Sequence, residues 1–145
     1  MKIAEFLTLL EEKSGMSPLA FSEEGVISFT FNSDFTANIE KSDDDQLLTV
    51  YAKIGDLPSK NREECMKALL EANLFGQKTR GAAIGLDSDT QELYIFKSFD
   101  CTSIEFESFF EQFSNILQAQ QEWTAIIKDN NFLPAPKGMQ PNIYR

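Results

Sequence analysis

Apolar residues recur along this chain with two different spacings, which separate the expected helices from the expected strands. From Lys2 to Ser14 they fall at i, i+3, i+4 and i+7, so we predict an amphipathic helix that ends at Gly15. The next three segments alternate apolar with polar residues, which predicts antiparallel strands with one buried face. These segments are Val26–Asn32, Phe35–Lys41 and Leu47–Ile54.

A second helix is predicted from near Asn61 to about Phe75. Asn61 is followed three residues later by Glu64, which is the spacing of a capping box at a helix start. Gly76 stands where the end of a helix needs a left-handed residue. The apolar arc of this helix is wider than one core contact needs, which indicates a second surface for a partner.

Two further strands and a long helix complete the pattern, over Arg80–Asp87, Glu92–Asp100 and Ser103–Lys128. The element order is therefore α-β-β-β-α-β-β-α, which predicts a single α+β domain with helices packed on an antiparallel sheet. This domain is expected to span residues 1–131. Residues 132–145 contain three prolines and no periodic apolar face, so they are predicted to form a flexible tail.

The strand predicted at Glu92–Asp100 is apolar on both faces over its first half. Leu93 and Ile95 belong to one face, and Tyr94 and Phe96 belong to the other. An antiparallel strand with one face in water has polar residues at alternate positions. Both faces are therefore expected to be covered, and together with the wide middle helix this predicts a homodimer.

Charge and composition narrow the class of partner. The net charge of −10 and the pI of about 4.4 argue against binding to nucleic acid or to an anionic membrane surface. No segment approaches the run of about 20 apolar residues that spans a bilayer. Acidic residues interrupt the apolar N-terminal stretch, which is unlike a secretory signal. We therefore expect a cytoplasmic protein in which Cys65 and Cys101 stay reduced.

Residues for catalysis or metal binding are scarce. The chain contains no histidine, which is the commonest general base and metal ligand. It has no phosphate-binding loop, dinucleotide-binding fingerprint or nucleophile elbow. The acidic run Asp43–Asp45 lacks the spacing, the glycine and the closing glutamate of a calcium-binding EF-hand. We predict no enzyme activity, no catalytic residue, no metal site and no cofactor.

Three short motifs follow one another in the second half of the chain. They read Leu69-Leu70-Glu71-Ala72-Asn73-Leu74, Gly81-Ala82-Ala83-Ile84-Gly85-Leu86-Asp87 and Leu93-Tyr94-Ile95. In this order, and at this chain length, the motifs resemble those of the class I type III secretion chaperones, the small acidic CesT/SycE-like proteins. The resemblance covers the chain up to the C-terminal tail.

The resemblance implies a function and a set of partners. Such bacterial chaperones bind the N-terminal chaperone-binding segment of a secreted effector protein and keep it soluble without ATP. They deliver it to the type III export apparatus, at its ATPase or sorting platform. The effector segment wraps the dimer in extended form and adds main-chain pairing at a sheet edge. The dimer is expected to form through the middle helix and the strands after it. Its interface residues would be Met66, Leu70, Leu74, Ile84, Leu86, Tyr94 and Phe96.

The effector-binding surface is then expected on the first helix and the first three strands, because the later elements are committed to the dimer. Phe35 is the strongest candidate, since it begins a strand beside a turn, where an aromatic side chain is often only partly covered. The competing interpretation is that most of these residues are core. The candidate contacts are Phe6, Leu10, Phe29, Phe35, Ile39 and Val50.

Two other interpretations stay open at this point. The first keeps the fold but not secretion, as a YbjN-type module that binds some other protein. The second is a small enzyme or ligand-binding domain of similar α+β build, which a pocket with convergent polar groups would favour. Exposed apolar grooves on a dimer would favour the chaperone.

Overall fold

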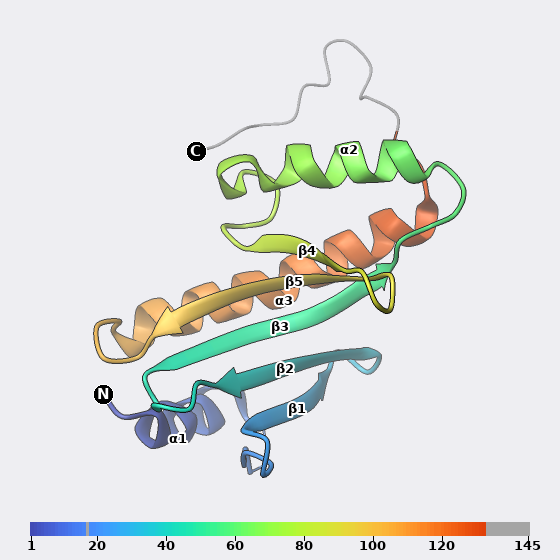
Figure 1. Ribbon diagram of the computed structural model, residues 1–145. Helices are drawn as coiled ribbons and strands as arrows, with labels where there is room; N and C mark the ends of the chain where they lie inside the picture. Colours follow the sequence, from blue (N-terminus) through green and yellow to red (C-terminus); the bar gives the residue numbers. More distant parts are fainter. Residues whose placement is uncertain (17, 133–145) are drawn as a thin grey trace.

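Each helix and strand that the hydrophobic pattern predicts is present in the computed structural model, which describes residues 1–16 and 18–132 (Figure 1). The elements are α1 (Ile3–Ser14), β1 (Val26–Phe31), β2 (Phe35–Lys41), β3 (Leu47–Asp56), α2 (Arg62–Asn73), the 3₁₀ turn η1 (Leu74–Gly76), β4 (Ala83–Asp87), β5 (Glu92–Asp100) and α3 (Phe106–Asp129). The strands form one antiparallel sheet in the order β1-β2-β3-β5-β4. The predicted α+β fold is confirmed.

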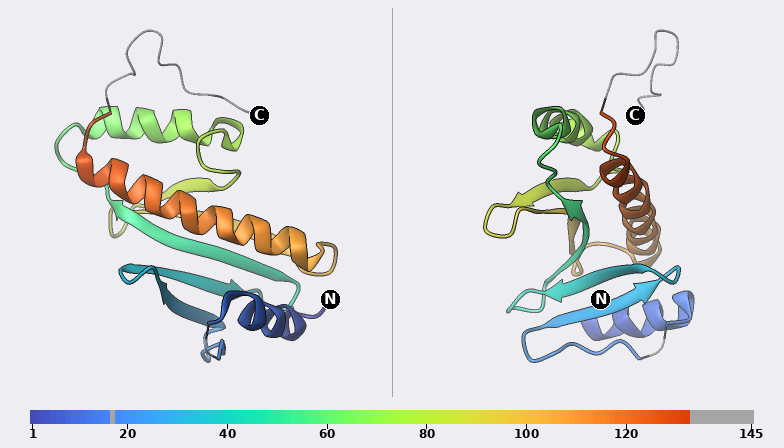
Figure 2. Two further views of the ribbon diagram at one scale, coloured as in Figure 1. Left: turned by 180° about the vertical axis from the view of Figure 1, so that it is seen from behind. Right: turned by 90° about the vertical axis from the view of Figure 1, so that its right-hand side faces the viewer.

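One face of the sheet carries the core. Helices α1 and α3 lie on the same side of the sheet, and α2 lies beyond the β4 edge (Figure 2). Alternate residues of β3, among them Val50 and Ile54, are buried beneath α3, while their neighbours Tyr51 and Lys53 are not. The period of two that predicted these strands therefore also predicted which face is covered.

Helix α1 joins the core through a run of aromatic contacts. The ring of Phe6 lies 5.8 Å from that of Phe106 and 5.3 Å, edge to face, from that of Phe109. Edge-to-face contacts of this kind add to the free energy gained from apolar burial. The helix ends at Gly15, whose left-handed backbone (φ 75°) allows its N–H to donate to Glu11, as the sequence predicted.

The β2–β3 ladder opens at one end, and a glutamine from α3 occupies the opening. Pairing between these strands stops at Asn38 and Tyr51. The next two carbonyls, of Thr36 and Lys53, both accept from Nε2 of Gln120, at 3.0 and 3.1 Å. Gln120 is only 3% exposed, so its amide donates to these two backbone carbonyls from within the core. The tip of the β1–β2 hairpin is thereby fixed on α3.

The start of α2 differs from the prediction. Asn61 precedes the helix but forms no side-chain cap, so the expected capping box with Glu64 is absent. The left-handed backbone of Asn61 (φ 58°) is not the extended conformation that directs a capping side chain at the first turn. Its amide donates instead to the carbonyl of Asn130, and Asn130 donates to the carbonyl of Lys60. These bonds connect the start of α2 to the end of α3.

The connection from α2 to β4 also differs. Helix α2 ends at Asn73, and Gly76, left-handed as predicted, closes the short turn η1 instead of the helix. Strand β4 begins at Ala83, three residues later than expected. Arg80 interrupts the strand, because its backbone is left-handed (φ 54°), and its guanidinium forms an ion pair with Glu122 of α3 at 2.7 Å. A residue in that conformation cannot continue a strand.

One residue of the predicted tail packs against the core. Phe132 is half-buried and packs against the core, so this residue belongs with the folded part and not with the proposed tail. The remainder of that tail, 133–145, lies outside the described residues. Within the part of the chain that the structure describes, no helix combines the length and apolarity needed to cross a membrane.

Candidate functional site

Metal-binding clusters are not found among the described residues. No group of three or more Cys, Asp or Glu side chains is placed to hold a metal ion there. Cys65 and Cys101 are free and buried, and burial raises the pKa of both thiols, which keeps them protonated near neutral pH. The features that remain to be explained are apolar surfaces and sheet edges.

An apolar groove of about 220 Å³ runs between α2 and β4, and we call it the α2–β4 groove. Leu70 of α2 is 73% exposed beside it, and Met66 and Leu86 are exposed as well. The groove is lined by Leu57, Met66, Leu69, Leu70, Asn73, Ile84, Gly85, Leu86 and Leu93. Exposed apolar patches of this kind mark sites where another protein binds.

The residues predicted for the dimer interface divide between two faces. Met66, Leu70, Ile84 and Leu86 line the α2–β4 groove, although Ile84 is buried. Leu74 is exposed just beyond the end of α2. Two others, Tyr94 and Phe96, lie on the opposite face of β5, because they alternate with its buried residues.

Phe96 covers a glycine on that opposite face. A Cβ added at Gly85 would lie 3.2 Å from the ring of Phe96, so the ring rests directly on the backbone of β4. Phe96 nevertheless remains 38% exposed. A single flat partner surface therefore cannot contact both this ring and the α2–β4 groove without reaching around the β4 edge.

The outer edge of β4 is closed by two side chains. Asn73 accepts the N–H of Ile84 through Oδ1 at 2.7 Å and donates to the carbonyl of Ile84 through Nδ2 at 2.9 Å. The hydroxyl of Thr79 donates to the carbonyl of Ala82, and the N–H of Ala82 donates to the carbonyl of Thr79. Among the described residues, only the outward groups of Leu86 lack a partner on this edge. A partner at β4 must therefore bind chiefly through side chains.

The opposite edge of the sheet, at β1, is open. Alternate residues of β1 direct their backbone groups to β2, and the others direct them outward. Ser22 closes the outward groups of Val26, by donating to its carbonyl at 2.9 Å and accepting its N–H at 3.2 Å. The outward groups of Ser28 and Thr30 have no partner within the described part of the chain. They can pair with an added strand.

Three half-buried phenylalanines line the same hairpin. The ring of Phe31 stacks on that of Phe35 at 5.7 Å and lies 6.0 Å from that of Phe29. Phe29 in turn contacts the buried ring of Phe113 in α3 at 5.8 Å. We call the open edge at Ser28 and Thr30, together with Phe29, Phe31 and Phe35, the β1 surface.

Four of the six candidate effector contacts are core residues. Phe6 and Ile39 are 0% exposed, and Leu10 and Val50 are equally closed to a partner. The expectation that these four lie on a surface is wrong, because the apolar stripe of α1 and the apolar face of the sheet pack into one core with α3. Phe29 and Phe35 are half-buried, so they remain available as contacts. Burial is a tertiary property that the periodic pattern does not contain.

The face of the sheet away from the helices carries a small ionic network. Nζ of Lys53 lies 2.7 Å from Glu92 and 3.0 Å from Asp56, and the hydroxyl of Tyr94 donates to Glu92 at 2.9 Å. The hydrogen bonds from Lys53 and Tyr94 lower the pKa of Glu92, and the contact with Glu92 raises the pKa of Lys53. This part of the face is charged and hydrated.

Sequence reasoning missed the residues that close the sheet edges. Asn73 enters the sequence pattern only as part of a motif, and no motif contains Ser22 or Thr79. Their small polar side chains can bond to nearby backbone, which is a signal for turns and caps. That signal does not say which backbone group accepts or donates.

The sequence assigns this α+β domain to a family. Residues 5–124 match the Tir chaperone protein (CesT) family, and the chain belongs to this family. The resemblance inferred from the motifs is confirmed. No curated protein sequence matches the chain.

Several solved structures share the fold at low sequence identity. One is a chain of the HopA1–SchA chaperone–effector complex, with 17% identity and a TM-score of 0.67 over 84% of this chain and 92% of that one. Another is from the Yersinia pestis type III secretion chaperone SycH in complex with a fragment of YscM2, with 13% identity and a TM-score of 0.64 over 82% and 97%. A third is YbjN from E. coli, with 16% identity and a TM-score of 0.58 over 90% of this chain and 96% of that one.

Proposed function

We propose that this protein is a type III secretion chaperone that binds the N-terminal segment of a secreted effector and keeps it soluble and competent for export. Membership of the CesT family and the likeness to chains from chaperone–effector complexes support this function. The observation that carries it is the open edge of β1 beside three half-buried phenylalanines. Binding and release at such a surface need no ATP.

The β1 surface suits an extended segment. A strand laid beside β1 would pair with the free backbone groups of Ser28 and Thr30, and alternate apolar side chains would cover Phe29, Phe31 and Phe35. Each 100 Å² of apolar area covered would contribute about 2.5 kcal/mol to the free energy of binding. The cost of ordering the client chain opposes this contribution. A long wrapped contact is therefore needed for useful affinity.

The chaperone is proposed to act as a homodimer joined through the α2–β4 groove. The exposed apolar side chains of Met66, Leu70 and Leu86 support this, because a second copy would cover them. The closed edge of β4 favours side-chain contacts in this interface over a continuous sheet. The proposed dimer works in the bacterial cytoplasm and delivers its client to the ATPase or sorting platform of the export apparatus.

The second candidate is a protein-binding module of the YbjN type without a role in secretion. The likeness to YbjN from E. coli, at a TM-score of 0.58, keeps this alternative in view. The two candidates differ in the client. A chaperone of this family would bind the N-terminal segment of an exported protein, whereas a general module would not require that segment.

The function is tested by co-purifying the protein from its native host, identifying the bound protein, and measuring the affinity of that protein's N-terminal segment. Thr30→Pro removes the outward N–H at an edge position, where proline is tolerated, and Thr30→Val, which also lacks the hydroxyl, keeps that N–H as the control. We expect Thr30→Pro to weaken binding and Thr30→Val to preserve it. A client that binds without its N-terminal segment would contradict the proposed function, and equal binding by both variants would contradict pairing at β1.

A further inference from the structure

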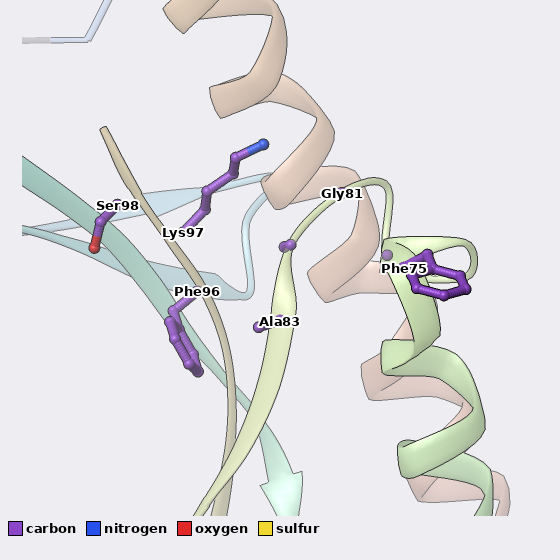
Figure 3. A pocket seen from close by; sticks show the side chains of 8 residues that line it. Phe75, Gly81, Ala83, Phe96, Lys97 and Ser98 are labelled. Atoms are coloured by element: carbon purple, nitrogen blue, oxygen red, sulfur yellow. The ribbon is translucent and has the colours of Figure 1, made fainter. Parts of the chain in front are cut away.

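A second hollow, of about 390 Å³, lies at the other end of the sheet from β1, where β4 separates from β5 (Figure 3). Its walls include Phe75 of the turn after α2, Gly81 and Ala83 at the start of β4, and Phe96, Lys97 and Ser98 of β5. It is distinct from the α2–β4 groove, with which it shares no lining residue.

The hollow exposes a free stretch of main chain. Pairing between β4 and β5 ends at Ala83 and Phe96, but β5 continues to Asp100. The register places Gly81 opposite Ser98, yet the N–H of Gly81 donates to the carbonyl of Gly76 instead. The groups of Ser98 that point toward β4 therefore have no backbone partner among the described residues. An added peptide could take the place that β4 leaves.

An exposed aromatic side chain lies across the hollow from this stretch (Figure 3). Phe75 is 86% exposed, so burial does not explain its position, and its backbone is left-handed (φ 56°, ψ 20°). That conformation is costly for a bulky residue and points to a functional role when the surroundings enforce it. The surroundings enforce it here, because the connection from α2 to β4 folds back on itself. A Cβ on Gly76 would lie only 2.9 Å from Cα of Gly81.

A cation without a counter-ion completes the hollow. Lys97 is the basic residue that lines the hollow, and it has no carboxylate within 4.0 Å in the described part of the chain. Its ammonium lies 5.9 Å from the ring of Phe99 and would lie 3.6 Å from a Cβ at Gly81. In a chain with a net charge of −10, an ammonium left unpaired between apolar walls suits a carboxylate from outside.

We propose that this hollow binds a second, extended segment of the client protein, one that carries a carboxylate next to an apolar side chain. The segment pairs with the free main chain of Ser98, its apolar side chain packs between Phe75 and Phe96, and its carboxylate contacts Lys97. The inference rests on the proposed function, since it takes the ligand to be the client chain. The acidic body of the protein repels acidic peptides elsewhere, so Lys97 supplies the specificity.

The test uses full-length ¹⁵N-labelled protein and two synthetic probes. Both are acetylated heptapeptide amides of alternating leucine and threonine, one with a central aspartate and the other with asparagine in its place. We expect the aspartate peptide to shift the backbone amide signals of Ser98 and Gly81. We expect the asparagine peptide to bind there roughly three- to five-fold more weakly, as one exposed ion pair allows.

Lys97→Met should abolish the preference for the aspartate peptide, and Lys128→Met, which removes an exposed lysine on α3, should preserve it. The proposed site in the hollow would be overturned if the amide signal of Ser98 did not move. It would also be overturned if Lys97→Met kept the preference for the aspartate peptide. If Ser28 and Thr30 respond while Ser98 does not, the proposed function stands and this inference fails. If the Ser98 signal shifts but the client binds without its N-terminal segment, the peptide site in the hollow is supported and the proposed function fails.

Discussion

The side chain of Asn73 pairs with the backbone of Ile84 as another strand would. It accepts the N–H at 2.7 Å and donates to the carbonyl at 2.9 Å, so one amide occupies both outward groups of a residue on an edge strand. An unpaired strand edge is a template for unwanted pairing with other chains. The end of α2 therefore protects the edge of β4 while leaving the groove beside it free for side-chain contacts.

Replacing Asn73 with alanine should destabilise the fold by about 1–3 kcal/mol, because two partly buried backbone groups of Ile84 lose their partners. Asn73→Asp should also be costly, since a carboxylate oxygen would face the carbonyl of Ile84. Urea denaturation of both variants measures the loss. Glu71→Ala, at an exposed position of the same helix, is the control and should stay within about 0.5 kcal/mol of wild type. An unchanged stability for Asn73→Ala would show that water replaces the amide.

Leu70→Glu should convert the proposed dimer to a folded monomer. Leu70 is 73% exposed in the single chain, so the charge is tolerated there and becomes unfavourable only when a second copy covers it. Light scattering at micromolar concentration measures the mass, and circular dichroism checks the fold. Ile84→Glu is a poorer test, because Ile84 is already buried and its loss would unfold the chain.

Thr8→Glu adds the same charge at an exposed position of α1, away from the α2–β4 groove, and should leave the dimer intact. A monomeric wild type, or a Leu70→Glu variant that remains a dimer, would rule out this interface.

Phe35→Ala separates structural from binding roles on the β1 surface. A fully buried phenylalanine costs about 3–5 kcal/mol on truncation, and half-buried Phe35 should cost about 2 kcal/mol. If the client covers Phe35, binding of its N-terminal segment should weaken by about 30-fold, the effect of an interface hot spot. Thermal melting and calorimetric titration on the same samples give both values. Full binding by the folded variant would remove Phe35 from the client surface.

Glu92→Gln should lower the thermal midpoint at pH 7 and have progressively less effect toward about pH 3. The bonds from Lys53 and Tyr94 hold the pKa of Glu92 below its ordinary value of 4.5. Because the folded state has the lower pKa, ionised Glu92 stabilises the fold above the unfolded-state pKa. That stabilisation is lost as the pH falls through the folded-state pKa.

The measurement is the difference in thermal midpoint between wild type and variant at each pH. Glu24→Gln, which removes a charge from an exposed loop, serves as the control and should leave the thermal midpoint at pH 7 nearly unchanged. If the difference in thermal midpoint between wild type and Glu92→Gln increases as the pH falls, the network with Lys53 and Tyr94 is not formed in solution.

The order of elements, and the face that each strand buries, were determined by the sequence itself. Spacings of 3.6 and 2 are local properties, so Phe29 and Val50 could be assigned to the apolar faces of their strands without knowing what covers them. The lack of histidine is likewise a property of the sequence alone, and it limits the chemistry that the folded chain can perform.

Only the tertiary structure decided which apolar residues stay accessible and which sheet edge stays open. Phe6 and Phe35 both belong to apolar faces, yet Phe6 is fully buried against Phe106 and Phe109 of α3, whereas Phe35 is only half-buried. Gln120 of α3 binds one carbonyl of β2 and one of β3, which lie 84 and 67 residues away in the chain. Burial and edge closure depend on segments that are distant in sequence, and no local pattern records which of them will meet.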